Sequence, residues 1–71
     1  MSADVHALLE DAGRRGLKVS FIALQAGGWK CVVDGVGLAP RQGVGRTGTE
    51  ALAAVLELVT AIEARKAARE G

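Results

Sequence analysis

The most distinctive spacing in this sequence belongs to the glycines of segment 43–48, which reads G-V-G-R-T-G and fits the pattern G-x-G-x-x-G. In dinucleotide-binding folds this pattern lies in the first turn of a βαβ unit, with an acidic residue about 20 positions further on. Here the segment leads into a helical pattern, and no strand pattern follows it. We therefore expect these glycines to form a tight turn from a strand to a helix.

The same turn offers a weaker chemistry, which is anion binding. A helix N-terminus presents unpaired N–H groups and the positive end of the helix dipole. A neighbouring guanidinium and two hydroxyls suit a phosphate or a carboxylate of a partner. The candidate anion site comprises Arg46, Thr47, Gly48 and Thr49.

The other reactive side chains are isolated from one another. His6 is the only histidine and lies off the apolar stripe of the first predicted helix. Cys31 alternates with Trp29 and Val33, a position typical of a small buried hydrophobe. The sequence contains no candidate catalytic triad, paired carboxylates or cysteine–histidine cluster. We therefore expect a protein that is not an enzyme and that binds no metal and no cofactor.

Length and composition set further limits. A chain of 71 residues allows one small domain, spanning 1–71. Its net charge of +1 and its 3% of aromatic residues argue against a protein built around nucleic acid or base stacking. The sequence has no apolar run of about 20 residues and no secretory signal, and its single cysteine suits a reducing compartment. We expect a cytoplasmic protein that does not bind membranes.

Two helices are predicted. The first runs from Asp4 to Ala12, with Ser2 as its N-cap, and Gly13 followed by Arg14-Arg15-Gly16 marks its stop. The second begins at Thr47, which with Glu50 forms the pattern of a capping box. Its wide apolar face comprises Ala51, Leu52, Val55, Leu56, Leu58, Val59 and Ile62.

Strands are predicted from Leu17 to Gln25 and from Trp29 to Asp34, joined at Gly27-Gly28. A three-residue loop pairs Phe21 with Val33 and gives the cleaner division between an apolar and a polar face, so we prefer it to a two-residue loop. The glycine-rich segment from Gly35 to Arg46 is predicted to be a loop, with an optional short third strand from Gln42 to Gly45.

The predicted order is α-β-β-(β)-α, an α+β fold with two helices packed on one face of a small antiparallel sheet. In this register Ile22, Leu24 and Val32 lie on the face away from the helices, and Trp29 is partly covered near the turn. Exposed apolar clusters of this kind mark interfaces, unless the long helix or the glycine loop folds over them. The candidate partner-binding residues are Ile22, Leu24, Trp29 and Val32, with Arg14, Arg15, Arg41 and Arg46 as charges at the rim.

A small basic cluster follows the apolar part of the second helix. Its cations suit the negative end of the helix dipole and also suit a nucleic-acid backbone. The cluster comprises Arg65, Lys66 and Arg69.

Two families resemble this sequence. The order α-β-β-β-α with Gly43-x-Gly45-x-Thr47-x-x-Glu50-Ala51 resembles part of the double-stranded RNA-binding domain, although Gly48-Thr49-Glu50 stand where that family has lysines. The succession of strand, Gly-Gly turn, tryptophan-containing strand, proline and G-x-T-x-x-E-A is similar to the half-fold of HicB-type antitoxins. In size and composition the chain also resembles short phage-encoded proteins that modulate host machinery, anti-CRISPR proteins among them.

We therefore predict a non-catalytic module that binds a larger protein partner. The resemblances imply a regulator or inhibitor of host machinery carried by a phage or mobile element. A homodimer through the same sheet face is compatible with this function. The alternative is a module that binds the backbone of double-stranded RNA or DNA, and a small-ligand or phosphate sensor at the 43–49 turn ranks last.

Overall fold

The computed structural model describes residues 4–35 and 37–70. Its elements are α1 (Val5–Arg14), β1 (Leu17–Ala23), β2 (Trp29–Gly35), β3 (Leu38–Gly45) and α2 (Gly48–Glu70). The predicted α+β class is confirmed, and the optional third strand is present.

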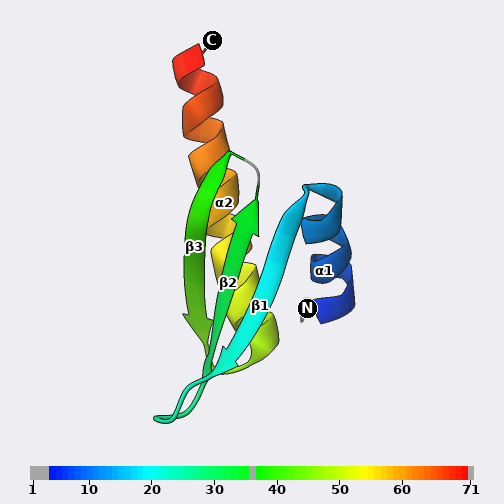
Figure 1. The fold of residues 1–71 in the computed structure, drawn as a ribbon, viewed down its shortest axis with the longest axis vertical. Helices are drawn as coiled ribbons and strands as arrows, with labels where there is room; N and C mark the ends of the chain where they lie inside the picture. The colour runs from blue at the N-terminus through cyan, green and yellow to red at the C-terminus, as the bar shows by residue number, and fades with distance from the viewer. Residues whose placement is uncertain (1–3, 36, 71) are drawn as a thin grey trace.

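The three strands form one antiparallel sheet in the order β1-β2-β3. Figure 1 views this sheet with α2 behind β2 and β3, and with α1 beside and behind β1. Both helices contribute to one core with the sheet, so one face is covered and the other is open. The buried residues are Ala12, Cys31, Val33, Ala51, Leu52, Val55, Leu56 and Val59.

The register of the β1–β2 hairpin corrects our prediction. Phe21 pairs with Cys31, not with Val33, so the loop covers residues 24–28 and not three residues. Leu24 has left the strand, and its N–H donates to the Gly28 carbonyl at 3.1 Å. Gly27 and Gly28 have φ of +98° and +91°, a backbone region that favours glycine. Because the register moves by two residues, each side chain keeps its predicted face.

The third strand is longer than predicted. It begins at Leu38, whereas the sequence indicated a short strand starting at Gln42. Pro40 lies within it, on an edge of the sheet and beside a register shift between Val33 and Gly35. An edge position or a bulge tolerates a residue that lacks an N–H donor. The proline therefore marks an edge strand here, and the loop interpretation of this segment is wrong.

The boundaries of α1 also differ from the prediction. Asp4 caps the helix by accepting the His6 N–H at 3.1 Å, and the predicted cap Ser2 lies outside the described residues. The helix continues through Gly13 to Arg14. The left-handed residue after it is Gly16, at φ +74°. The predicted end of the helix at Ala12 was therefore two residues too early, and Gly16, not Gly13, is the glycine that follows the helix.

Thr47 caps α2 as predicted. Its hydroxyl accepts the Glu50 N–H at 3.1 Å. The Glu50 carboxylate accepts the N–H of Arg46 at 2.9 Å, one residue before the position that a capping box requires. The helix therefore begins where the sequence indicated, with a slightly different set of contacts.

Two glycines of the G-x-G-x-x-G segment allow α2 to lie close against β3. A Cβ built on Gly43 would lie 2.7 Å from the Ala51 carbonyl oxygen and 2.7 Å from the Val55 nitrogen. A Cβ on Gly45 would lie 2.6 Å from that of Glu50. These glycines are required by backbone packing, beyond the tight turn that we predicted.

The apolar face of α2 is narrower than predicted. Five of its seven residues are buried, but Leu58 is 42% exposed and Ile62 is half-buried. Beyond Ile62 the described side chains of the helix are exposed. Figure 1 shows this last part of α2 projecting past the end of the sheet, which agrees with the charged and alanine-rich sequence there.

Candidate functional site

The two aromatic residues of the chain lie together at the surface. Phe21 and Trp29 are on the covered side of the sheet, yet they are 38% and 39% exposed, and the core contains only alanine, cysteine, valine and leucine. They lie on adjacent strands, at diagonal positions across the Phe21–Cys31 and Ala23–Trp29 pairs. With Val5, Gly48 and Thr49 they line a depression of about 440 Å³, which we call the aromatic depression.

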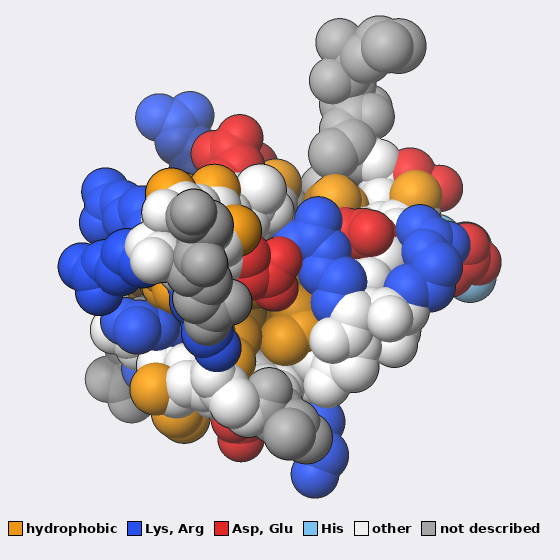
Figure 2. All heavy atoms as spheres, turned by 90° about the horizontal axis from the view of Figure 1, so that it is seen from above, with side chains coloured by type: hydrophobic (Ala, Val, Ile, Leu, Met, Phe, Trp, Pro, Cys, Tyr) orange, Lys and Arg blue, Asp and Glu red, His pale blue; other side chains and the backbone are white. Residues whose placement is uncertain are grey.

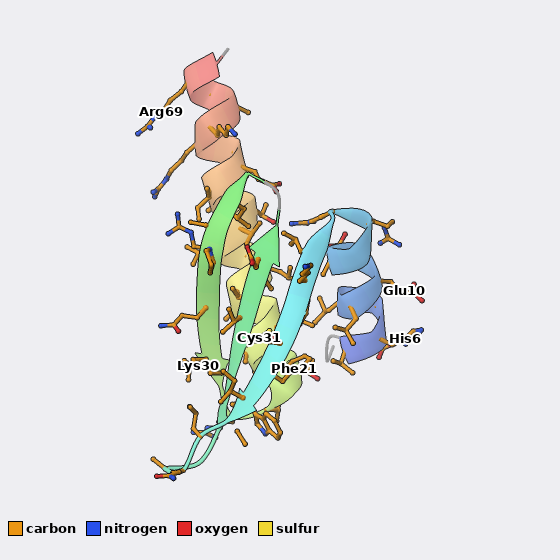
Figure 3. All side chains as sticks on the ribbon, in the orientation of Figure 1. His6, Glu10, Phe21, Lys30, Cys31 and Arg69 are labelled. Atoms are coloured by element: carbon orange, nitrogen blue, oxygen red, sulfur yellow. The ribbon has the colours of Figure 1, made fainter. Side chains whose placement is uncertain are left out.

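The position of the aromatic depression follows from where α2 begins. Trp29 pairs with Gly45 at the end of the sheet, and α2 starts only at Gly48. The covered face therefore extends beyond the residues that α2 buries. A Cβ on Gly48 would lie 3.4 Å from two carbons of the Phe21 ring, so the ring packs against the first residue of α2. Figure 3 shows Phe21 low on β1, near the start of α2.

The lining of the aromatic depression is uncharged. Three apolar side chains, a glycine and the Thr49 residue surround it. It contains no acid, base or nucleophile for a reaction. The arrangement suits an apolar group more than a charged one.

The structure separates the apolar residues that the sequence grouped together. Ile22 and Val32 lie on the open face, where Ile22 is 44% exposed and Val32 is half-buried. Leu24 is half-buried in the hairpin loop, and Trp29 lies on the covered side. The prediction that Trp29 is only partly covered is confirmed. These four residues do not form one surface.

Two exposed apolar residues of the sheet, Phe21 and Val44, were not among the predicted site residues. Phe21 has the alternation of an inward-facing residue, and it does face the helices, but α2 does not extend over it. Val44 lies on the open face and is 61% exposed, in a strand that was interpreted mainly as loop. Alternation identifies the face of each residue, but the length of the covering helix decides its burial.

The predicted rim arginines have different roles. The Arg15 guanidinium donates to the Thr60 hydroxyl at 3.0 Å and lies 3.1 Å from the Asp11 carboxylate, so it joins α1 to α2. Arg14 lies 3.7 Å from the same carboxylate. Arg41 and Arg46 are exposed on β3 and before α2. The four arginines therefore do not surround a common surface.

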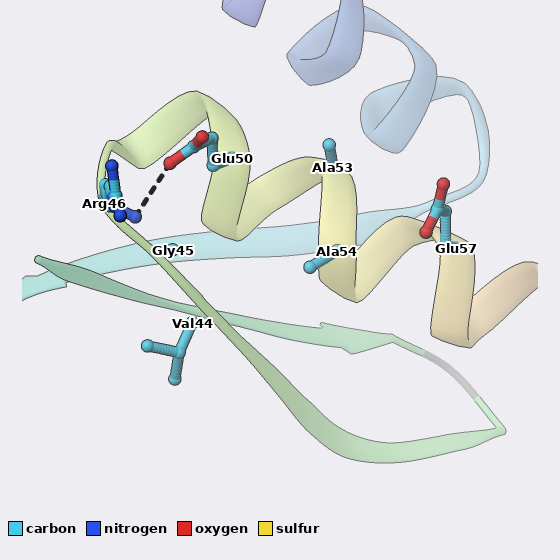
Figure 4. Close-up of a pocket in the computed structure, with 7 residues that line it drawn as sticks. All are labelled: Val44, Gly45, Arg46, Glu50, Ala53, Ala54 and Glu57. Carbon is cyan, nitrogen blue, oxygen red and sulfur yellow. Dashed lines mark hydrogen bonds between the residues drawn. The ribbon is translucent and has the colours of Figure 1, made fainter.

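The candidate anion site at the start of α2 is already in contact with a carboxylate. Glu50 accepts the Arg46 N–H, and the Thr47 hydroxyl accepts the Glu50 N–H. Figure 4 shows the contact between Arg46 and Glu50. These two residues line a hollow of about 510 Å³, which is also lined by Glu57. With the carboxylates of Glu50 and Glu57 and one guanidinium, that of Arg46, the lining of this hollow has a net negative charge, which disfavours a bound phosphate.

The basic cluster of α2 lies far from that turn. From Gly48 to Arg65 the helix rises by about 25 Å at 1.5 Å per residue. Figure 2, a view onto the end of α2, shows Lys and Arg side chains gathered around it, and Figure 3 shows Arg69 pointing away from the body of the protein. The two halves of the predicted nucleic-acid site therefore do not meet in one place.

The remaining reactive groups have structural surroundings. His6 is exposed on α1, and its Nε2 lies 2.9 Å from the Glu10 carboxylate. Cys31 is buried, and this burial raises the pKa of its thiol above the ordinary value of 9.0. A raised pKa keeps the thiol neutral and unreactive. Within residues 4–35 and 37–70, no three His, Cys, Asp or Glu residues gather in a way that could hold a metal ion.

Comparisons with protein-family models, with curated proteins and with solved structures find no match to this chain. Neither described helix has an apolar stretch as long as a bilayer span requires.

Proposed function

We propose that this protein is a non-catalytic module that binds a larger protein through the aromatic depression. The observation that carries the proposal is the placement of Phe21 and Trp29. A chain with only two aromatic residues would gain most by burying them in its core, yet it keeps both half-exposed around one hollow. Aromatic residues in such positions are enriched among those that dominate binding energy at protein interfaces.

The shape of the aromatic depression favours a protein partner over a small ligand. Small-molecule sites enclose most of the ligand surface. Here the lining side chains of Val5, Phe21 and Trp29 are each more than one third exposed, so the hollow is shallow and open. Such a surface suits one or two apolar side chains from a convex partner. Polar groups around them contribute orientation more than affinity.

The proposal is tested by capture from a bacterial lysate with tagged variants. We expect the wild-type chain to retain one protein in stoichiometric amount, and Trp29→Ser and Phe21→Ser to lose it. Leu58→Ser is the matched control, because Leu58 has almost the same exposure as Trp29 but lies in the middle of α2 and does not line the aromatic depression. Circular dichroism melts confirm that each variant is folded. Equal recovery by Trp29→Ser, Phe21→Ser and the wild type would refute the proposed site.

A second candidate function is binding to a nucleic-acid backbone. The cations around the end of α2 support it, as does an element order like that of the double-stranded RNA-binding domain. Neutralised phosphates release counterions, so binding would weaken steeply with salt. We expect Arg65→Ala with Arg69→Ala to reduce that salt dependence. Capture that survives nuclease, or binding to duplex RNA that is unchanged between low and moderate salt, argues against this candidate.

A further inference from the structure

The open face of the sheet carries two opposite charges on either side of a valine. Residues Lys30, Val32 and Asp34 of β2 alternate with the buried Cys31 and Val33, so all three point to the open side. No described segment covers this face, which faces the viewer in Figure 1. Within residues 4–35 and 37–70, neither Lys30 nor Asp34 takes part in an ion pair.

The neighbours of these charges form rows across the strands. Lys30 lies between Ile22 of β1 and Val44 of β3. At the other end of β2, Asp34 lies beside Lys18. One end of the open face is therefore apolar around a lysine, and the other end carries the carboxylate.

We propose that the open face binds a second copy of this chain, face to face about a twofold axis. The axis lies between the two sheets, runs perpendicular to the strands and passes over Val32. This operation places Lys30 opposite Asp34 of the second copy, and Asp34 opposite Lys30 of the second copy. Two identical ion pairs then flank a central valine contact. The self-complementarity of an interface between identical subunits requires this reciprocal arrangement.

The same twofold rotation also covers apolar side chains of the open face. Ile22 comes to lie opposite Lys18 of the second copy, whose aliphatic stem covers apolar surface while its ammonium group stays in water. Sheets that pack in this way lie about 10 Å apart with their strands roughly aligned. No other partner is needed to explain the charge pattern, because the face itself supplies the complementary groups.

The size of the open face predicts a weak dimer. Three strands about 4.8 Å apart, over about 20 Å of strand length, present roughly 300 Å² of flat surface per copy. This is less than the roughly 800 Å² per partner of a stable interface. The association is therefore reversible and depends on protein concentration.

Sedimentation equilibrium of the purified protein, at concentrations up to the millimolar range, tests the proposal. We expect a monomer–dimer equilibrium for the wild type. Lys30→Asp alone and Asp34→Lys alone should each raise the dissociation constant by about 10-fold or more, because like charges then face each other twice. An equimolar mixture of these two variants should associate again as a heterodimer, and so should the variant that carries both changes.

Arg65→Asp and Glu63→Lys are controls for net charge, since both residues are exposed on the last part of α2. They should dimerise as the wild type does. A wild type that stays monomeric at every concentration, or single variants that associate as the wild type does, would overturn the proposal. The test uses this chain alone, so its failure leaves the partner site at Phe21 and Trp29 untouched.

Discussion

The two faces of the sheet are built from alternate residues of the same three strands, and they differ in what lies on them. On the covered face, β2 contributes the fully buried Cys31 and Val33, while β3 contributes Gly43, which brings α2 close. On the open face, Ile22 and Val44 stay largely in contact with solvent. Adjacent residues of one strand therefore lie in the core and at the surface in turn. Substitutions at adjacent positions test this difference between the two faces.

The largest effect is expected from exchanging a residue of the covered face for a charge. Val33→Asp buries an unpaired carboxylate, which should cost more than about 4 kcal/mol and exceed the stability of a small domain. Val32→Asp, one residue earlier on the open face, should cost about 1 kcal/mol. In a urea titration followed by circular dichroism, Val33→Asp should show no cooperative unfolding transition, whereas Val32→Asp should keep one with a lowered midpoint. Similar losses in the two variants would contradict the assignment of faces.

The close approach of α2 to β3 gives the next effect. Gly43→Ala forces a methyl group against the Ala51 carbonyl and the Val55 nitrogen, and we expect a loss of about 1–3 kcal/mol. Gly13→Ala is the control, because the residue is in α1 and the added methyl group has nothing within 4 Å beyond its chain neighbours and the backbone of its own helix. It should stabilise the protein by about 0.5–1 kcal/mol. A neutral Gly43→Ala would mean that α2 is not in backbone contact with β3.

A smaller effect is expected at the cap of α2. Thr47→Ala removes the acceptor of the Glu50 N–H and should lower the free energy of unfolding by about 1 kcal/mol. Thr49→Ala, two residues later, removes a hydroxyl outside this cap and should change the stability by less than half as much. Thermal and urea unfolding compare the two variants. An equal loss in both would assign the cap to another group.

The smallest effect concerns the thiol of the covered face. Because burial raises the pKa of Cys31, the folded protein holds the thiol proton more tightly than the unfolded chain does. The neutral thiol therefore contributes its full share of the free energy of unfolding below pH 9.0, the ordinary pKa, and this share is lost as the pH rises above that value. Cys31→Ala should therefore lose less stability than the wild type between pH 8 and pH 10. Rapid alkylation of the thiol in the folded wild type would contradict its burial.

Local patterns were sufficient to predict much of this fold. The alternation of Val19, Phe21, Cys31 and Val33 identified the covered face, although the predicted strand register was wrong by two residues. A register shift of two residues leaves each side chain on the same face of the sheet. The threonine cap located the start of α2. The order of elements and the α+β class followed from these signals.

Other features depend on tertiary packing and could not be predicted from local patterns. Gly43 and Gly45 were interpreted as parts of a tight turn, because their close approach to α2 is visible only in the packed structure. Leu24 continues the apolar run of β1, so the true end of that strand was hidden. The aromatic depression depends on where α2 starts relative to the sheet end, which no local pattern records.

The proposed function places a protein partner against Trp29 in the aromatic depression. Trp29 is the only tryptophan of the chain, so labelling with 5-fluorotryptophan gives a single ¹⁹F resonance that a partner's own tryptophans cannot obscure. We would measure this resonance in the free protein and in the complex captured from the lysate, each in H₂O and in D₂O. We expect a solvent isotope shift in the free protein that is lost in the complex. An unchanged resonance and an unchanged isotope shift in the complex would contradict it.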